Sequence, residues 1–157
     1  MGFGWAKPVP VDWRNFANPR KDMMFVSLAG PLSNIALAVL CSAFLRMISP
    51  YENEFLFILM SLAVYINVAL AVFNMLPLYP LDGSSILKGL VSRELAIKLA
   101  ALDRMGGFFI LGAFLLDHFL HTGILWLVIG FPILWVVRLL SQDAFPMLQE
   151  VLMIAFS

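Results

Sequence analysis

The sequence predicts an all-α polytopic membrane protein with about four transmembrane helices, and three observations lead to this prediction. Apolar residues make up 62% of the 157-residue chain and charged residues 13%, whereas soluble domains average roughly 45–50% and about 25%. A domain of this size cannot enclose so much apolar surface. The apolar residues also gather in runs that approach or exceed the roughly 20 residues needed to cross a bilayer. We therefore treat residues 1–157 as one membrane domain.

Residues 1–22 precede the first apolar run and are too polar to span a membrane. Pro8 and Pro10 flank Val9, and Val11 follows, so we expect an extended backbone rather than a helix. The segment lacks the apolar run and small-residue cleavage site of a secretory signal. Its tryptophans suit the membrane interface, so we expect an extended, membrane-associated segment.

The two longest apolar runs predict two transmembrane helices. Residues 23–48 carry one charge, Arg46, near the end of the run, where its side chain can reach the lipid headgroups. Residues 55–78 carry no charge at all. Because both runs exceed the length that a bilayer requires, each is predicted to cross the membrane once.

The rest of the chain predicts an amphipathic helix followed by two shorter spans. In residues 84–105, leucines alternate with charged residues at helical spacing, which is typical of a helix lying at the membrane interface. Residues 106–120 and 122–140 are apolar and are joined at His121. We interpret them as a hairpin of two spans, the alternative being one re-entrant pair. Residues 141–157 form the tail.

The distribution of basic residues predicts the orientation. Lys and Arg number four before the first span, one after it, four between the second and third spans, none in the next loop and one in the tail. Cytoplasmic loops are enriched in these residues, so four spans with both termini in the cytoplasm place nine of the ten there. The prediction is a multi-pass protein of the cell membrane with both termini cytoplasmic.

Charge and cysteine content exclude two classes of protein. The formal net charge is zero, so the chain has no basic surface for nucleic acid. The single cysteine, Cys41, excludes a disulfide framework and a thiolate metal cluster.

The stretch NMLPLYPLDG, residues 74–83, is the strongest candidate for a functional site. Pro77 and Pro80 cannot continue a regular helix, so the backbone is predicted to break at membrane depth. Asp82 follows the break, and an acidic group beside a membrane is often an ion or metal ligand. The alternative, which we weight equally, is that Asp82 caps the next helix, with Gly83 allowing the turn.

Three asparagines place amide groups within the first two spans. Asn67 and Asn74 are seven residues apart, which is two helical turns, so they lie on one face. Asn34 lies in the first span, close to small residues that permit close approach of another helix. These amides either link helices, which is the favoured interpretation, or hydrogen-bond a substrate.

His118 and His121 lie beside Asp117 with a spacing that would suit a metal ion. The predicted topology places them in the outer loop, across roughly 30 Å of hydrocarbon from Asp82. A polar connection between two helices is therefore the favoured interpretation.

Several motifs together resemble the site-2 protease family of intramembrane zinc metalloproteases, within which the short prokaryotic branch is most similar. They occur in order over residues 3–90 as GWAKPVPV, NPRKD, AGPLSN and N-x-x-P-x-x-P-L-D-G. The resemblance implies that Asp82 is a zinc ligand and that Asn74 assists at the substrate carbonyl. It also implies that Val9 and Val11 belong to a β element that pairs with an unwound substrate. Asn34 and Asn67 are added as candidate substrate contacts.

The chain departs from the family in one respect. The H-E-x-x-H motif, which in the family supplies two zinc ligands and the general base, is absent from these 157 residues. A catalytic zinc takes three protein ligands and a water, so one carboxylate is not enough. We expect the C-terminal part of a zinc protease that cleaves transmembrane segments, inactive by itself and holding zinc only in the complete enzyme.

Two other functions stay open at this stage. One is a non-catalytic membrane scaffold that binds helices. The other is a small transporter or channel subunit in which the broken helix holds an ion. The presence of a single helix break, at residues 77–80, disfavours the transporter, since such folds pair their broken segments.

Overall fold

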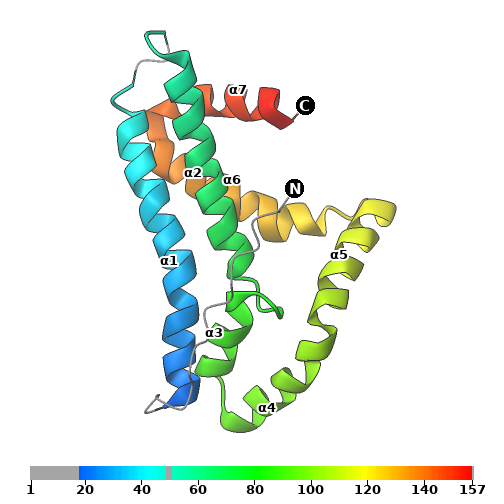
Figure 1. The fold of residues 1–157 in the computed structure, drawn as a ribbon. Coiled ribbons are helices and arrows are strands. Elements are labelled where there is room, and N and C mark those ends of the chain that lie inside the picture. Colours follow the sequence, from blue (N-terminus) through cyan, green and yellow to red (C-terminus); the bar gives the residue numbers. More distant parts are fainter. Residues whose placement is uncertain (1–17, 49–50, 157) are drawn as a thin grey trace, which may run out of the picture.

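The computed structural model describes residues 18–48 and 51–156, all of it helices and connections (Figure 1). Val9 and Val11, and the extended segment predicted around them, lie outside the described residues. The two longest neighbouring helices are α1, Pro19–Leu45, and α2, Glu54–Asn74. They occupy the sequence predicted as the first two spans, although α2 ends four residues before residue 78.

Local sequence explains where these two helices begin. Pro19 lies in the first turn of α1, where its missing N–H is not needed. Asn53 caps α2, because its side-chain oxygen accepts a hydrogen bond from the Leu56 amide at 3.0 Å. Along their length the helices pack side by side (Figure 1), and the core residues Ala38, Val64 and Val68 are fully buried.

The prediction of one continuous amphipathic helix over residues 84–105 is wrong. The structure has two helices there, α3 (Asp82–Leu90) and α4 (Arg93–Leu102). The break has a local cause, since the Ser92 hydroxyl accepts a hydrogen bond from the Leu95 amide at 3.4 Å and starts a new helix. α4 then continues through a 3₁₀ turn, Asp103–Met105, into α5, Gly106–Leu120.

Among the described residues, three helical stretches are long and apolar enough to cross a membrane: Pro19–Leu45, Glu54–Asn74 and Arg93–Leu120. A fourth apolar stretch, Trp126–Ser141, is shorter. It consists of a π-helical turn, Trp126–Gly130, followed by α6, Phe131–Ser141. The prediction of an all-α membrane protein is confirmed, with three long apolar helices and one shorter one.

The C-terminal residues fold back onto the core formed by α1 and α2. The carbonyl of Leu140, at the end of α6, accepts hydrogen bonds from Ser42 Oγ, at 2.5 Å, and from Arg46. Residues 145–156, predicted as part of the tail, form α7, whose Leu148 and Leu152 are buried in the core. α6 therefore ends beside the connection from α1 to α2, at the opposite end from α3 (Figure 1). The side of the membrane on which the tail lies stays a prediction.

Candidate functional site

The candidate site lies at the junction of α2 and α3. Asn74 is the last residue of α2 and Asp82 is the first residue of α3. Residues 75–81 connect them through short turns, in which the Leu78 amide donates to the Leu76 carbonyl and the Leu81 amide to the Leu78 carbonyl, both at 2.8 Å. The break expected from the two prolines is therefore present.

Gly83 explains how α3 can pack directly against the end of α2. A Cβ atom on residue 83 would lie 2.3 Å from the carbonyl oxygens of both Met75 and Leu76, which is far inside van der Waals contact. No side chain fits at this position without moving one of the helices. The residue after Asp82 thus fixes where α3 starts, and with it the position of the carboxylate.

The Asp82 carboxylate faces α1 at Gly30. A Cβ atom on residue 30 would lie 3.0 Å from Asp82 Oδ2, so the missing side chain of Gly30 leaves the space that the carboxylate occupies. Within residues 18–48 and 51–156, the Asp82 side chain has no hydrogen bond and no ion pair. Partial burial raises the pKa of this carboxyl above its ordinary value.

These observations bear on the alternative that Asp82 merely caps a helix. The N-cap residue of α3 is Leu81, and the helix has no side-chain cap hydrogen bond. Asp82 still carries its charge in the first helical turn, where the helix dipole favours it. Both carboxylate oxygens nevertheless lack a hydrogen-bond donor from the described part of the chain, so they are available to a cation or an external donor.

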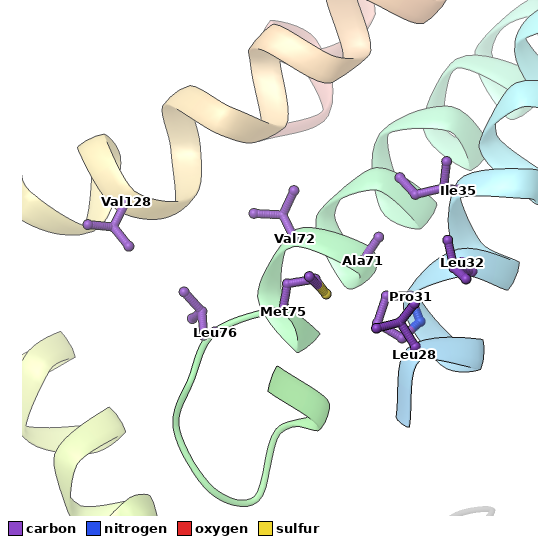
Figure 2. A pocket seen from close by; sticks show the side chains of 9 residues that line it. All are labelled: Leu28, Pro31, Leu32, Ile35, Ala71, Val72, Met75, Leu76 and Val128. Atoms are coloured by element: carbon purple, nitrogen blue, oxygen red, sulfur yellow. The ribbon is translucent and has the colours of Figure 1, made fainter. Parts of the chain in front are cut away.

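An apolar groove of about 420 Å³ lies beside this junction (Figure 2). Its walls come from α1, the end of α2 and the π-helical turn. The lining residues are Leu28, Pro31, Leu32, Ile35, Ala71, Val72, Met75, Leu76 and Val128. Pro31 follows Gly30 in sequence, and Met75 follows Asn74, so the groove begins at the residues that border the candidate site. It is shaped for apolar side chains.

The three asparagines differ in their surroundings. The Asn67 side-chain amide donates to the Ala63 carbonyl at 2.8 Å, one turn earlier in the same helix. That bond lies within α2 and so does not link two helices, contrary to the favoured interpretation. Asn34 and Asn74 are half-buried and have no side-chain hydrogen bond to any other described residue.

The connection between α5 and the π-helical turn is a structural one. Asp117 Oδ1 accepts hydrogen bonds from Thr122 Oγ1 at 2.5 Å and from the Ile124 amide at 2.9 Å. His118 and His121 are exposed, and His121 ends α5 with a left-handed backbone, φ 50°. Across residues 18–48 and 51–156, no three His, Cys, Asp or Glu side chains lie close enough to hold a metal ion. Asp82 alone does not form a zinc site.

The contact between Asp82 and Gly30 could not be predicted from the sequence. Gly30 is one of the small residues near Asn34, and nothing around it in the sequence indicates a residue 52 positions later. The contact arises because α3 continues along α1 after the break.

The comparisons with known proteins cover the candidate site. The family model "Peptidase family M50" matches residues 51–114, a range that contains Asn74 and Asp82. Over these residues the chain is similar to peptidase family M50, the family of site-2 proteases. It is 38% identical over 112 residues to "Putative zinc metalloprotease YwhC" of Bacillus subtilis (strain 168). It is also 40% identical over 63 residues to "Putative zinc metalloprotease MJ0611" of Methanocaldococcus jannaschii.

The extent of these matches is limited. The Bacillus match covers 67% of this chain and 51% of the relative. The Methanocaldococcus match covers 40% of this chain and 32% of the relative. The chain thus spans about half of the first relative and a third of the second. No solved structure matches the chain.

Proposed function

We propose that this chain supplies the aspartate-bearing part of an intramembrane zinc metalloprotease of the site-2 type, with Asp82 as one metal ligand. The observation that carries the proposal is the Asp82 carboxylate, which lies at a helix break within the residues that match the M50 family model, with both oxygens free of described partners. A carboxylate that capped a helix would accept a hydrogen bond from a backbone amide, as Asp117 does from Ile124.

The remaining ligands would come from a segment outside these 157 residues. Catalytic zinc takes three protein ligands and a water, and the described residues offer one. The surface beside Asp82 supports the docking of a further helix, because Ala29, Gly30 and Ser33 on α1 are exposed and small. The apolar groove adds a surface for larger side chains next to them. We therefore propose that an H-E-x-x-H helix packs there.

The substrates that we propose are transmembrane segments of other proteins, cleaved by peptide hydrolysis within the bilayer. Asn74, at the break, would donate a hydrogen bond to the carbonyl under attack, a role that its side chain is free to take. Val9, Val11, Asn34 and Asn67 stay candidate substrate contacts. For Asn67 one amide hydrogen is already bonded within α2, so its contribution would be small.

The test is complementation in liposomes. The chain is purified alone and together with a membrane segment that carries H-E-x-x-H, and cleavage of a fluorescent transmembrane peptide is measured with zinc content. The chain alone is expected to bind zinc weakly and to leave the peptide intact, and the pair to cleave it. Asp82→Ala in the pair should abolish both cleavage and the gain in zinc. Full cleavage and zinc content with Asp82→Ala would refute the proposal.

The same experiment tests a second candidate function, that of a non-catalytic membrane scaffold. The apolar groove beside the candidate site favours this function, since a scaffold would bind membrane helices there. Such a protein would bind the transmembrane peptide in liposomes, measured by energy transfer, but no added H-E-x-x-H segment would produce cleavage. Leu32→Trp, which fills the groove, would then weaken binding.

We also propose that the chain is a multi-pass protein of the cell membrane with the α3–α4 end in the cytoplasm. In a chain with Cys41→Ala, single cysteines at the exposed residues Glu52 and Ser92 should react with impermeant reagent from opposite sides. A third single cysteine, at exposed Gln149, tests on which side of the membrane α7 lies. Reaction from the Glu52 side supports the packing of α7 beside α1 and α2, and reaction from the Ser92 side supports a tail that returns to the cytoplasm.

A further inference from the structure

The middle of the α2–α3 connection is held on two sides by the segment that follows it. A Cβ atom on Gly106, the first residue of α5, would lie 2.1 Å from the Tyr79 carbonyl oxygen, so α5 begins in direct contact with the backbone of the connection. On the other side, Lys88 Nζ lies 5.9 Å from the centre of the Tyr79 ring, within the range of a cation–π contact. Tyr79 lies three residues before Asp82.

An ion pair joins these two contacts. Lys88 Nζ donates to Asp103 Oδ2 at 2.7 Å, linking α3 to the 3₁₀ turn that leads into α5. The two side chains are only 18% and 27% exposed, so the pair is screened less by solvent than a surface pair. Lys88 is on the helix that starts with Asp82, and Asp103 is three residues before Gly106. The pair therefore sets the distance between α3 and the start of α5.

The connection depends on these contacts because its packing there is incomplete. A cavity of about 160 Å³ lies between the connection, α3 and α5, and Pro77, Leu78 and Tyr79 form part of its wall. Ser84 Oγ also borders it, buried and without a hydrogen-bond partner in the described part of the chain. A segment that borders an empty volume can move into it at little steric cost. Van der Waals packing alone therefore does not fix residues 77–79.

We propose that Lys88 and Asp103 are positioning residues, which together with Gly106 form a clamp on Tyr79 and thereby hold Asp82 in place against Gly30. We name Lys88, Asp103 and Gly106 the Tyr79 clamp. Its effect on Asp82 follows from the chain, since Tyr79 and Asp82 are separated by two residues and Gly83 abuts the end of α2. Only its consequence for proteolysis rests on the proposed function.

Amide hydrogen exchange of the whole chain in detergent tests the clamp without any activity. Lys88→Met keeps the apolar stem and removes the charge, and it should speed the exchange of amides in residues 75–84 by about three- to tenfold. Lys88→Arg should restore slow exchange. Lys98→Met is the matched control, because Lys98 is an exposed lysine on α4, and it should leave residues 75–84 unchanged.

A second pair of variants keeps the proposal testable if Lys88→Met does not fold. Gly106→Ala places a methyl group against the Tyr79 carbonyl and should also speed exchange in residues 75–84, whereas Gly107→Ala meets nothing within 4 Å and should not. Faster exchange confined to residues 99–109, in Lys88→Met or in Gly106→Ala, would overturn the clamp. So would equal effects of Lys88→Met and its Lys98 control.

Cleavage in the complemented protein separates the clamp from the proposed function. Lys88→Met should lower cleavage about as far as exchange rises, with recovery in Lys88→Arg. If Asp82→Ala kept full cleavage while the exchange results held, the proposed function would fail and the clamp would stand. If Asp82→Ala abolished cleavage while Lys88→Met changed neither exchange nor cleavage, the clamp alone would fail.

Discussion

Two aspartates of this chain lie at helix ends, and their surroundings differ. Asp117, near the end of α5, accepts hydrogen bonds from Thr122 and Ile124 and so closes the connection to the next helical segment. Asp82, at the start of α3, has no such bond within residues 18–48 and 51–156, and its carboxylate faces Gly30 on another helix. Both residues carry a carboxylate, but of the two only Asp117 is hydrogen-bonded to described residues.

The difference separates a structural acid from a candidate ligand. Asp117 lowers the free energy of its own connection, and nearby His118 and His121 are exposed without forming a metal site with it. Asp82 is partly buried, which raises the pKa of its carboxyl, and it forms no hydrogen bond with the described residues around it. Burial of a carboxylate without a compensating hydrogen bond is typical of functional sites. The following predictions, from the largest effect to the smallest, can break or sharpen this contrast.

Asp82→Ala is expected to have the largest effect. In the complemented protein it should reduce cleavage to background and lower zinc occupancy, because it removes the proposed metal ligand. Asp117→Ala should leave both unchanged and instead lower the free energy of unfolding, because the hydrogen bonds to Thr122 and Ile124 are lost. Cleavage assays, metal analysis and thermal unfolding in detergent measure the three quantities. Equal effects of the two variants on zinc would remove the contrast.

Asn74→Ala is expected to lower turnover by about 10²- to 10³-fold while leaving zinc bound, as expected for a lost donor to a developing oxyanion. The matched variant is Asn67→Ala, on the same face of α2 but bonded to Ala63 within the helix. It should change turnover little. Single-turnover rates with zinc analysis compare them, and zinc loss in Asn74→Ala would assign Asn74 to the metal site instead.

Gly83→Ala should lower the free energy of unfolding by about 1–3 kcal/mol, because its methyl group would collide with the carbonyls of Met75 and Leu76. It should also reduce cleavage, since α3 must shift and carry Asp82 with it. Gly112→Ala in α5 is the control, because its methyl group meets nothing within 4 Å. That variant should be neutral or more stable by up to about 1 kcal/mol. A neutral Gly83→Ala would contradict the tight junction.

The smallest effect is on the pH dependence of stability, measured on the chain without metal. Burial raises the pKa of Asp82 in the folded state above its unfolded value of 3.8, so the unfolded chain ionises first and stability falls as pH rises through the window between the two values. Asp82→Asn cannot ionise and escapes this loss. The variant should therefore unfold at a higher temperature than the parent chain near pH 7 and at the same temperature near pH 3. A higher midpoint for the parent at pH 7 would show that Asp82 has a stabilising partner.

The sequence alone determined those features that depend on neighbouring residues. Hydropathy located two helices long enough for a membrane, α1 and α2, since the length of an apolar run is a local property. Pro77 and Pro80 located the break after α2, because a missing N–H acts within one helical turn. The candidate acid, Asp82, followed from its place after that break.

Only the tertiary structure decided what surrounds that acid. Gly30, the groove beside it and the contact of Gly106 with Tyr79 join residues that are far apart in sequence. The burial of α7 and the end of α6 beside α1 likewise depend on which apolar faces pack together. In a chain that is 62% apolar, almost every helix face is hydrophobic. Apolar pattern therefore cannot select among possible neighbours, and steric fit between particular side chains makes the choice.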